Sequence, residues 1–143
     1  MGKDIKKIVA YYSKLYKTNN PFELADCLNI EVFKLPLGSM LGYYIYMKRH
    51  RCIFINSDIE DGILRNIVMA HELGHATMHR NDNCYFISNK TLLLTSKIER
   101  QANKFAAELL INDNMLKDYE GYTIEQFSKI TGFNEELIKL KFL

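Results

Sequence analysis

The sequence predicts an α+β fold in which a small β-sheet packs against several helices. In several segments, apolar residues recur at every third or fourth position, which is typical of amphipathic helices. Between about residues 30 and 55, short segments rich in β-branched and aromatic residues alternate instead, which is typical of strands. The third observation is the segment VMAHELGHATMH at residues 68–79, where a histidine pattern lies on one of the predicted helices.

Length and composition indicate one domain that spans residues 1–143. A chain of 143 residues with 48% hydrophobic and 25% charged residues is large enough to bury one core. No apolar run approaches the roughly 18 residues that a membrane span needs. Residues 1–17 carry charges on both sides of their apolar positions, unlike a signal peptide. The sequence therefore predicts a cytoplasmic protein with no membrane partner.

Charge and cysteine content narrow the partners further. The formal net charge of +2 gives no strong field for a nucleic acid, so direct nucleic-acid binding is not expected. Cys27, Cys52 and Cys84 include no CxxC pair, which argues against a disulfide framework and a zinc knuckle and favours buried free thiols. The sequence leaves the oligomeric state open.

The chain is predicted to begin with two helices. Helical spacing of apolar residues predicts an amphipathic helix over residues 4–17 that covers the core. Asn20 is expected to cap a second helix, with Pro21 at its first position and Glu23 at its third, a capping-box arrangement. That helix is expected to end near residue 29.

The middle of the chain is predicted to supply the sheet and the two longest helices. Residues 30–36 alternate as a strand, and residues 42–55 are expected to form a hairpin with a charged turn. The acidic residues at 58–61 suit the positive end of a helix that runs to about residue 80. Another helix is predicted over residues 96–111.

The segment from about residue 113 is predicted to be a short helical C-terminal part of the same domain. Two helices joined at Gly132 have the outline of a helix-turn-helix. However, the second of them mixes Glu135 and Glu136 with two lysines, which gives no basic face for phosphates. Packing or protein contact is therefore favoured over DNA recognition.

The spacing of His71, Glu72 and His75 has a definite chemical use. His71 and His75 are one helical turn apart, so both imidazoles can reach one zinc ion. Glu72 lies about 100° around the helix, where its carboxylate can act as general base without becoming a ligand. This is the HExxH pattern of a zincin-like active-site helix.

His79 is not expected to bind the same ion. It lies about 12 Å along the helix axis from His71. The longer zincin pattern also fails, because Met78 and Asn81 stand where glycine and histidine are needed. The competing interpretation of HExxH is a histidine stripe on the surface. The apolar residues at 64–68 share the face of His71, which indicates that this face points into the protein.

The third ligand is expected on the helix over residues 96–111. Glu99 lies at the edge of a stripe of alanines, and these small residues, together with Gly74, permit close approach of the two helices. Asn103, one turn further, is expected to accept the second N–H of a ligating histidine. Glu108 lies on the opposite side and is expected to face solvent. The alternative for Glu99 is an ordinary acidic residue at a helix N-terminus.

The motifs AHELGHATMH and IERQANKFAAELLI together resemble the ImmA/IrrE family of small metallopeptidases. That family joins HELGH to a helix with the pattern E-x-x-A-N-x-F-A-x-x-L-L, and the looser similarity covers about residues 20–111. One departure is the segment LLIND, where members usually have a proline after the two leucines.

The resemblance implies a zinc peptidase with a regulatory role. By resemblance, His71, His75 and Glu99 bind zinc, and Glu72 is the catalytic acid and base. Family members commonly cleave a helix-turn-helix repressor of a mobile element, which implies a protein substrate of that kind.

The expected reaction is hydrolysis of a peptide bond by a zinc-bound water, with Glu72 transferring the proton to the leaving amine. A strand of the hairpin is expected to align an extended substrate by edge pairing. The alternative function is an anti-repressor that contains zinc and sequesters the regulator without cleaving it. The candidates for stabilising the oxyanion are Tyr43, Tyr44, Tyr46, His79 and Arg80.

Overall fold

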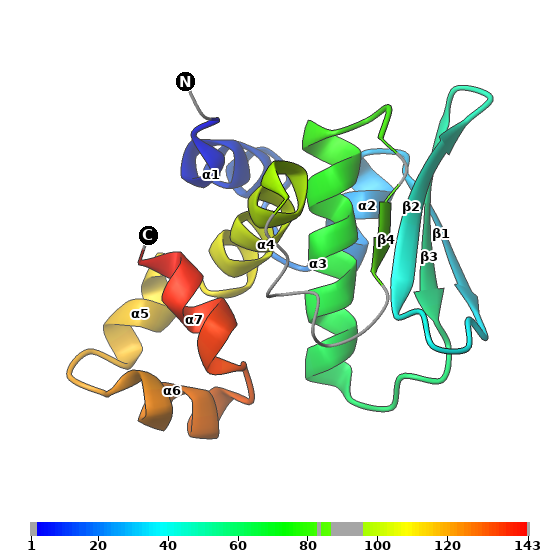
Figure 1. Cartoon of the computed structure of the whole chain (residues 1–143). Coiled ribbons are helices and arrows are strands. Elements are labelled where there is room, and N and C mark those ends of the chain that lie inside the picture. Colours follow the sequence, from blue (N-terminus) through cyan, green and yellow to red (C-terminus); the bar gives the residue numbers. More distant parts are fainter. Residues whose placement is uncertain (1–2, 83, 87–95, 143) are drawn as a thin grey trace.

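The computed structural model describes residues 3–82, 84–86 and 96–142. It confirms the α+β class, with a four-stranded sheet on one side of a long helix, α3, and further helices on the other side (Figure 1). The elements are α1 (Ile5–Tyr16), α2 (Pro21–Cys27), β1 (Glu31–Leu35), β2 (Gly42–Met47), β3 (His50–Asn56), α3 (Gly62–Met78), β4 (Cys84–Phe86), α4 (Lys97–Leu110), α5 (Asp113–Asp118), α6 (Ile124–Thr131) and α7 (Glu135–Lys141).

The sheet has the order β1-β3-β2-β4. β1 is parallel to β3, whereas β2 is antiparallel to both β3 and β4. The predicted hairpin is confirmed, and both residues of its turn, Lys48 and Arg49, have positive φ angles of 49° and 65°. Positive φ at both central positions is typical of a type I′ turn, which matches the twist of the flanking strands.

The sheet order narrows the prediction that a hairpin strand aligns substrate by edge pairing to residues 45–47 of β2, whose outer side pairs with no described strand. β3 has neighbours on both sides, and β4 pairs with residues Gly42, Tyr43 and Tyr44 of β2. Among the described strands, β1 and β4 are the two edges of the sheet. The sequence could not reveal this, because β4 has three residues and is too short to show a periodic pattern.

One face of the sheet holds α3 in place. Tyr44, Ile53 and Ile55 are fully buried on this face, and β2 and β3 both contact α3. The Tyr44 hydroxyl donates a hydrogen bond to the Arg80 carbonyl at 2.6 Å, which ties the end of α3 to the sheet. Alternate residues point to the other face, where the Phe54 ring stacks on Tyr43.

Capping side chains fix where the central helices begin. Asp61 accepts hydrogen bonds from the backbone N–H groups of the first turn of α3, and Ser96 accepts from the Glu99 N–H at the start of α4. Asn20 caps α2 as predicted. The reciprocal half of the predicted capping box is wrong, because the Glu23 carboxylate accepts from the Thr18 hydroxyl, and the Asn20 N–H donates to that hydroxyl.

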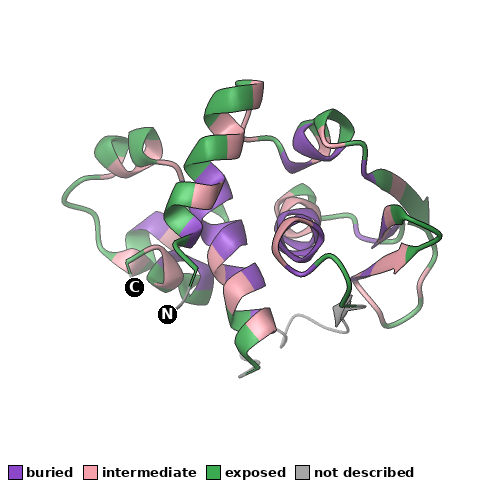
Figure 2. Ribbon diagram, turned by 90° about the horizontal axis from the view of Figure 1, so that it is seen from above, coloured by how far each residue is buried: buried purple, intermediate pink, exposed green. Residues whose placement is uncertain are grey.

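Small residues bring α3 and α4 into close contact, as predicted. A Cβ atom added to Gly74 would lie 3.0 Å from the Phe105 Cβ and 3.2 Å from the Ala102 Cα. Ala102 and Ala106 are fully buried on the same side of α4. Figure 2, which looks along α3, shows the buried residues concentrated on this helix and on the neighbouring faces. Any larger residue at position 74 would separate the two helices.

Among the C-terminal helices, α7 packs against α4, and α6 packs against α7 (Figure 1). Leu137 and Ile138 of α7 are fully buried, so this helix is held by packing, as predicted. Thr123 and Gln126 form a capping box at the start of α6, and Gly132 ends α6 with a φ of 85°. α5 begins where the helical C-terminal segment was predicted to begin, but it was not predicted as a separate helix, because its six residues include no buried apolar position.

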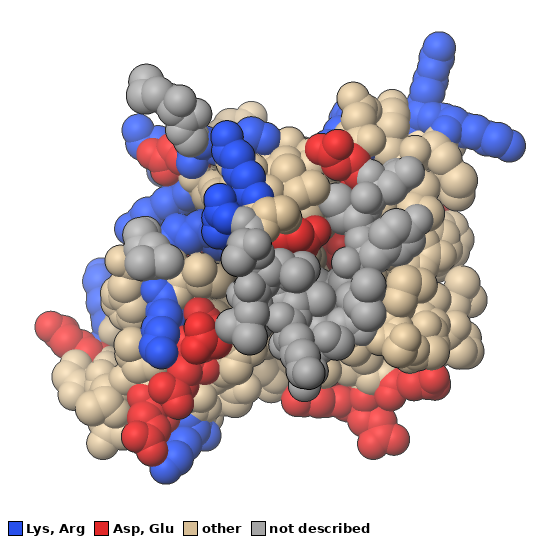
Figure 3. All heavy atoms as spheres, in the orientation of Figure 1, with Lys and Arg blue, Asp and Glu red and all other residues tan. Residues whose placement is uncertain are grey.

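The face of the molecule drawn in Figure 3 carries charges of both signs. On the face shown in Figure 3, the Lys and Arg side chains gather in separate groups, with acidic side chains between and below them. No described helix is long and apolar enough to cross a membrane. The prediction of buried thiols is wrong for Cys27, which is exposed, and confirmed for Cys52; the side chain of Cys84 lies outside the described residues.

Candidate metal centre

The two histidines of HExxH lie inside the protein. His71 is 1% exposed and His75 is 0% exposed, and their Nε2 atoms are 3.2 Å apart. One helical turn separates them, so their rings stand on the same face of α3. This burial contradicts the alternative of a histidine stripe on the surface.

Glu99 of α4 meets both imidazoles. Its Oε2 lies 2.9 Å from the His71 Nε2, a close contact without hydrogen-bond alignment, and its Oε1 lies 3.1 Å from the His75 Nε2. The alternative of an ordinary helix N-terminal acid does not account for these contacts. The close packing at Gly74 is what brings this carboxylate within reach.

The three donor atoms fit a metal ion. Two ligand atoms at the usual distances from a tetrahedral zinc ion are about 3.3 Å apart. The two Nε2 atoms are 3.2 Å apart, and each has one oxygen of the Glu99 carboxylate close by, Oε2 at 2.9 Å from His71 and Oε1 at 3.1 Å from His75. Two imidazole nitrogens and one carboxylate are also a donor set that zinc accepts in catalytic sites with an open fourth position.

Glu72 is the second carboxylate of the centre. Ligand atoms of His71, Glu72 and His75 all lie within 4.8 Å of one another, so Glu72 competes with Glu99 for the third ligand position. The contacts of Glu99 with both Nε2 atoms favour Glu99. Glu72 is fully buried, and neither of its oxygens has a hydrogen-bond partner among the described residues. Such a group is costly to bury unless a ligand or water contacts it.

The two carboxylates have opposite proton affinities. Burial, together with the negative charge of Glu99, raises the pKa of Glu72 well above its ordinary value. Burial acts in the same direction on Glu99, but its contacts with His71 and His75 outweigh this and lower the pKa to about 2. Glu99 therefore carries the negative charge of the centre, and Glu72 readily accepts a proton.

Asn103 contacts the other nitrogen of His71. Its Oδ1 lies 2.7 Å from the His71 Nδ1, and the amide is 1% exposed. An amide oxygen only accepts, so this contact places the imidazole proton on Nδ1 and leaves a lone pair on Nε2. The contact is the one expected from the sequence.

His79 and Gln101 form a second polar contact that the sequence did not predict. The His79 Nδ1 lies 3.0 Å from the His75 Nδ1, and the His79 Nε2 lies 2.7 Å from the Gln101 Oε1. Burial lowers the pKa of both His75 and His79. The step of four residues from His75 to His79 was the available signal, because it places the rings one turn apart.

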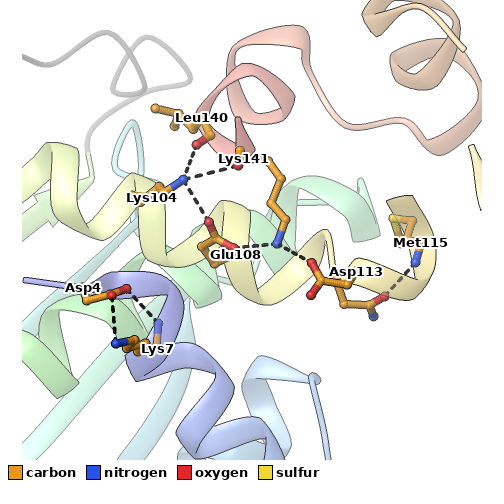
Figure 4. A network of polar contacts seen from close by, with 9 residues as sticks. Asp4, Lys7, Lys104, Glu108, Asp113, Met115, Leu140 and Lys141 are labelled. Carbon is orange, nitrogen blue, oxygen red and sulfur yellow. Dashed lines mark hydrogen bonds and ion pairs between the residues drawn. The ribbon is translucent and has the colours of Figure 1, made fainter. Parts of the chain in front are cut away.

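The expectation that Glu108 faces solvent is wrong. Glu108 is 4% exposed and lies 2.9 Å from the Lys104 Nζ and 2.5 Å from the Lys141 Nζ (Figure 4). It does point away from the histidines, but α7 covers that side of α4. Both sides of α4 are therefore buried.

The candidates for the oxyanion remain unassigned. The Tyr44 hydroxyl is fully buried and bonded to the Arg80 carbonyl, and the Arg80 guanidinium lies over the Tyr46 ring at 5.9 Å. A surface hollow of about 790 Å³ lies between α2 and β1, but none of the residues of the metal centre lines it. The candidate metal centre lies elsewhere, between α3 and α4.

This arrangement defines the class of protein as a metallopeptidase with HExxH on its central helix. Residues 25–137 match the family described as "IrrE N-terminal-like domain", Peptidase_M78. The chain therefore belongs to this family of metallopeptidases.

Two relatives extend the match to almost the whole chain. One is the "Metallopeptidase ImmA" of Bacillus subtilis (strain 168), which is 34% identical over 143 residues, covering 99% of this chain and 79% of that protein. The other is the "Uncharacterized immunity region protein 2" of Bacillus phage phi105, which is 39% identical over 140 residues, covering 96% of this chain and 88% of that protein.

Proposed function

We propose that this protein is a zinc-dependent endopeptidase that cleaves a transcriptional repressor of a mobile element and so relieves repression. The observation that carries the proposal is that two buried carboxylates with different surroundings lie beside the same two histidines. Glu99 is charged and contacts both Nε2 atoms, whereas Glu72 is buried beside them with no hydrogen-bond partner among the described residues. A structural metal site has no need for the second carboxylate.

In this proposal, His71 and His75 hold the zinc ion through Nε2, and Glu99 holds it through its carboxylate. Asn103 keeps the proton of His71 on Nδ1, so that Nε2 stays available to the metal. A zinc ion held by these residues would lower the pKa of its water towards about 7 and would polarise the scissile carbonyl.

Glu72 moves the proton during hydrolysis. Its carboxylate takes a proton from the attacking water, and the resulting carboxylic acid gives that proton to the amine that leaves. Burial without fixed cations suits both steps, because it raises the pKa of Glu72 towards the working pH. No covalent bond to the protein is needed.

The nature of the substrate is supported by the relatives. One of them is named a metallopeptidase, and the other is named for the immunity region of a phage. A repressor of such an element works in the cytoplasm, which is where we place this protein. The mixed charges of α7, with Glu135 and Glu136 beside Lys139 and Lys141, give no basic face for a nucleic acid.

The second candidate is an anti-repressor that binds the regulator and does not cleave it. Such a protein would use the same zinc-stabilised fold and the same partner. Only the carboxylate of Glu72 separates the two functions, because sequestration needs a surface and no general base.

The deciding experiment compares the wild-type protein with Glu72→Gln. Each is incubated with the repressor-like protein encoded beside its gene, and the products are identified by mass spectrometry. We expect one discrete cut by the wild type. We expect Glu72→Gln to retain zinc and partner binding but to cleave more slowly by at least about 10² to 10⁴, the contribution typical of general acid–base catalysis.

A matched control is Glu23→Gln, which changes an exposed carboxylate near the start of α2. It should cleave at the wild-type rate. The proteolytic function is wrong if wild type and Glu72→Gln relieve repression equally and neither fragments the partner.

A further inference from the structure

Two amide side chains of α4 are linked to the histidines of the metal centre, Asn103 by direct contact with His71 and Gln101 through His79. The Asn103 oxygen contacts the His71 Nδ1 directly at 2.7 Å. The Gln101 oxygen lies 2.7 Å from the His79 Nε2, and the other nitrogen of His79 lies 3.0 Å from the His75 Nδ1. His79 thus occupies, for His75, the place that Asn103 occupies for His71.

In the series His75–His79–Gln101, the metal at one end and the amide oxygen at the other fix which atom donates in each hydrogen bond. If the Nε2 of His75 binds a metal, its proton must be on Nδ1, and the facing nitrogen of His79 must accept. A neutral His79 that accepts at Nδ1 carries its proton on Nε2. That nitrogen then needs an acceptor, which is what the Gln101 oxygen supplies. Each donor in the chain therefore faces an acceptor.

We infer that His79 and Gln101 are positioning residues that hold His75 in the tautomer and ring orientation required for metal binding. This inference rests on the metal centre of the proposed function and adds two residues to it. Gln101 sets the tautomer of His79, and His79 in turn sets that of His75. The metal-binding histidines would then both be held by α4, one directly and one through His79.

The backbone holds His79 at the right place for this role. His79 caps α3, its N–H donates to the His75 carbonyl at 2.7 Å, and its carbonyl accepts from the Asp82 N–H at 2.9 Å. Its side chain is buried, with the residue only 6% exposed. The ring therefore has little freedom to leave its contact with His75.

Three substitutions of His79 distinguish a hydrogen-bonding role from simple packing. The oxygen of asparagine falls near the place of the histidine Nδ1, whereas the polar end of glutamine falls near the place of Nε2. Phenylalanine keeps the ring and removes both nitrogens. We expect zinc affinity within about threefold of wild type for His79→Asn, and about 10- to 100-fold weaker binding for His79→Gln and His79→Phe.

Gln101 gives an independent test at the other end of the chain. Gln101→Glu keeps an acceptor and should keep zinc affinity, whereas Gln101→Met should weaken it, by a smaller factor than His79→Phe. The matched control is Gln126→Met, which removes a capping side chain of α6 far from the histidines along the chain. It should leave zinc affinity unchanged.

Zinc affinity is measured by competition with a chelating dye, and folding of each metal-free variant by its thermal melting curve. A second readout is the ¹⁵N chemical shift of the imidazole nitrogens in the zinc-loaded protein, which should show the proton of His79 on Nε2. Gln101→Met should lower the fraction of that tautomer. If His79→Phe does not fold, His79→Asn and His79→Gln should still differ by the stated ratio.

Equal zinc affinity of all His79 and Gln101 variants, with normal affinity of the wild type, overturns this inference and leaves the metallopeptidase proposal standing. A proton found on Nδ1 of His79 overturns it as well. Absence of zinc binding by the folded wild type overturns the inference and the metal centre together, so the two failures are distinguishable.

Discussion

α4 carries two buried glutamates whose surroundings differ. Glu108, towards its C-terminal end, is held by the ammonium groups of Lys104 and Lys141, and Lys141 also lies 3.6 Å from Asp113 (Figure 4). Glu99, in the first turn, contacts only titratable imidazoles among the partners described above. The Glu108 carboxylate is neutralised by lysine ammonium groups, whereas the ion-pair contacts of Glu99 among the described residues are with imidazoles.

The partners of a buried carboxylate distinguish a structural role from a functional one. The ammonium groups of Lys104 and Lys141 contact the carboxylate of Glu108, and Lys141 joins α4 to α7. Around Glu99, the Nε2 atoms of two imidazoles converge instead, and neutral imidazoles can offer these nitrogens to a cation. One side of α4 therefore holds α7 through ion pairs, and the other side contributes to the candidate metal centre.

The largest effects are expected when each of the two glutamates is replaced by glutamine and the two variants are compared. Glu108→Gln should destabilise the fold by about 3–5 kcal/mol, because it leaves buried lysines without their counter-charge. Zinc affinity of the folded protein should be kept. Glu99→Gln should lower zinc affinity by at least about 100-fold, beyond the range typical of an outer partner.

Denaturant unfolding and dye competition measure these two effects. Loss of zinc by Glu108→Gln together with retention of zinc by Glu99→Gln would contradict the roles assigned to the two glutamates.

Removing the direct amide contact should have the next largest effect. Asn103→Ala should weaken zinc binding about 10- to 100-fold, because His71 loses the acceptor that keeps its proton on Nδ1. Asn103→Asp retains an acceptor and is the control. Unchanged affinity in Asn103→Ala, measured by dye competition on folded protein, would remove this role.

Separating α3 from α4 tests the packing that brings Glu99 to the histidines. Gly74→Ala places a methyl group 3.0 Å from the Phe105 Cβ, which should cost about 1–3 kcal/mol as overpacking. It should also weaken zinc binding, since the carboxylate moves with α4. Gly62→Ala at the start of α3 meets nothing within 4 Å and is the matched control. Equal unfolding curves for the two variants would contradict this account.

The smallest expected effect concerns the stability of the metal-free protein. The pKa of Glu72 is raised in the folded state, so its stabilising contribution is complete below about pH 4.5 and is lost as the pH rises towards the folded-state pKa. Glu72→Gln has no titratable group at this position, so its stability does not fall as the pH rises for this reason. At pH 8 the metal-free variant should melt at least about 3 °C above the wild type, equivalent to about 1 kcal/mol.

Thermal melting in the presence of a chelator measures this difference, and it should vanish below pH 4.5. A variant that is less stable than the wild type at pH 8 would show that Glu72 has a stabilising partner.

Periodicity was sufficient for the longer elements. The boundaries of α1, α3 and α4 agree with the predictions to within a few residues, because each has a buried face and a capping side chain. β4 was missed, and α5 was not separated from the rest of the predicted helical C-terminal segment, because three and six residues give no readable pattern. The hairpin was found, but its place inside the sheet depends on β1 and β4, which pair with it from outside the segment.

The sequence by itself determined which residues share a face with His71 and His75, and that Gly74 permits close packing. These follow from the fixed geometry of the α-helix, which makes spacing along the chain equivalent to position around the axis. The spacing also singled out Glu99 and Asn103 on the neighbouring helix.

Only the tertiary structure decided which side chains meet across different elements. Glu108 was expected in solvent because it lies opposite the alanine stripe, yet α7 covers it with Lys141. In the same way, the contact of His79 with Gln101 depends on the end of α3 lying beside the first turns of α4. Such contacts depend on packing between segments far apart in the chain, which no local pattern encodes.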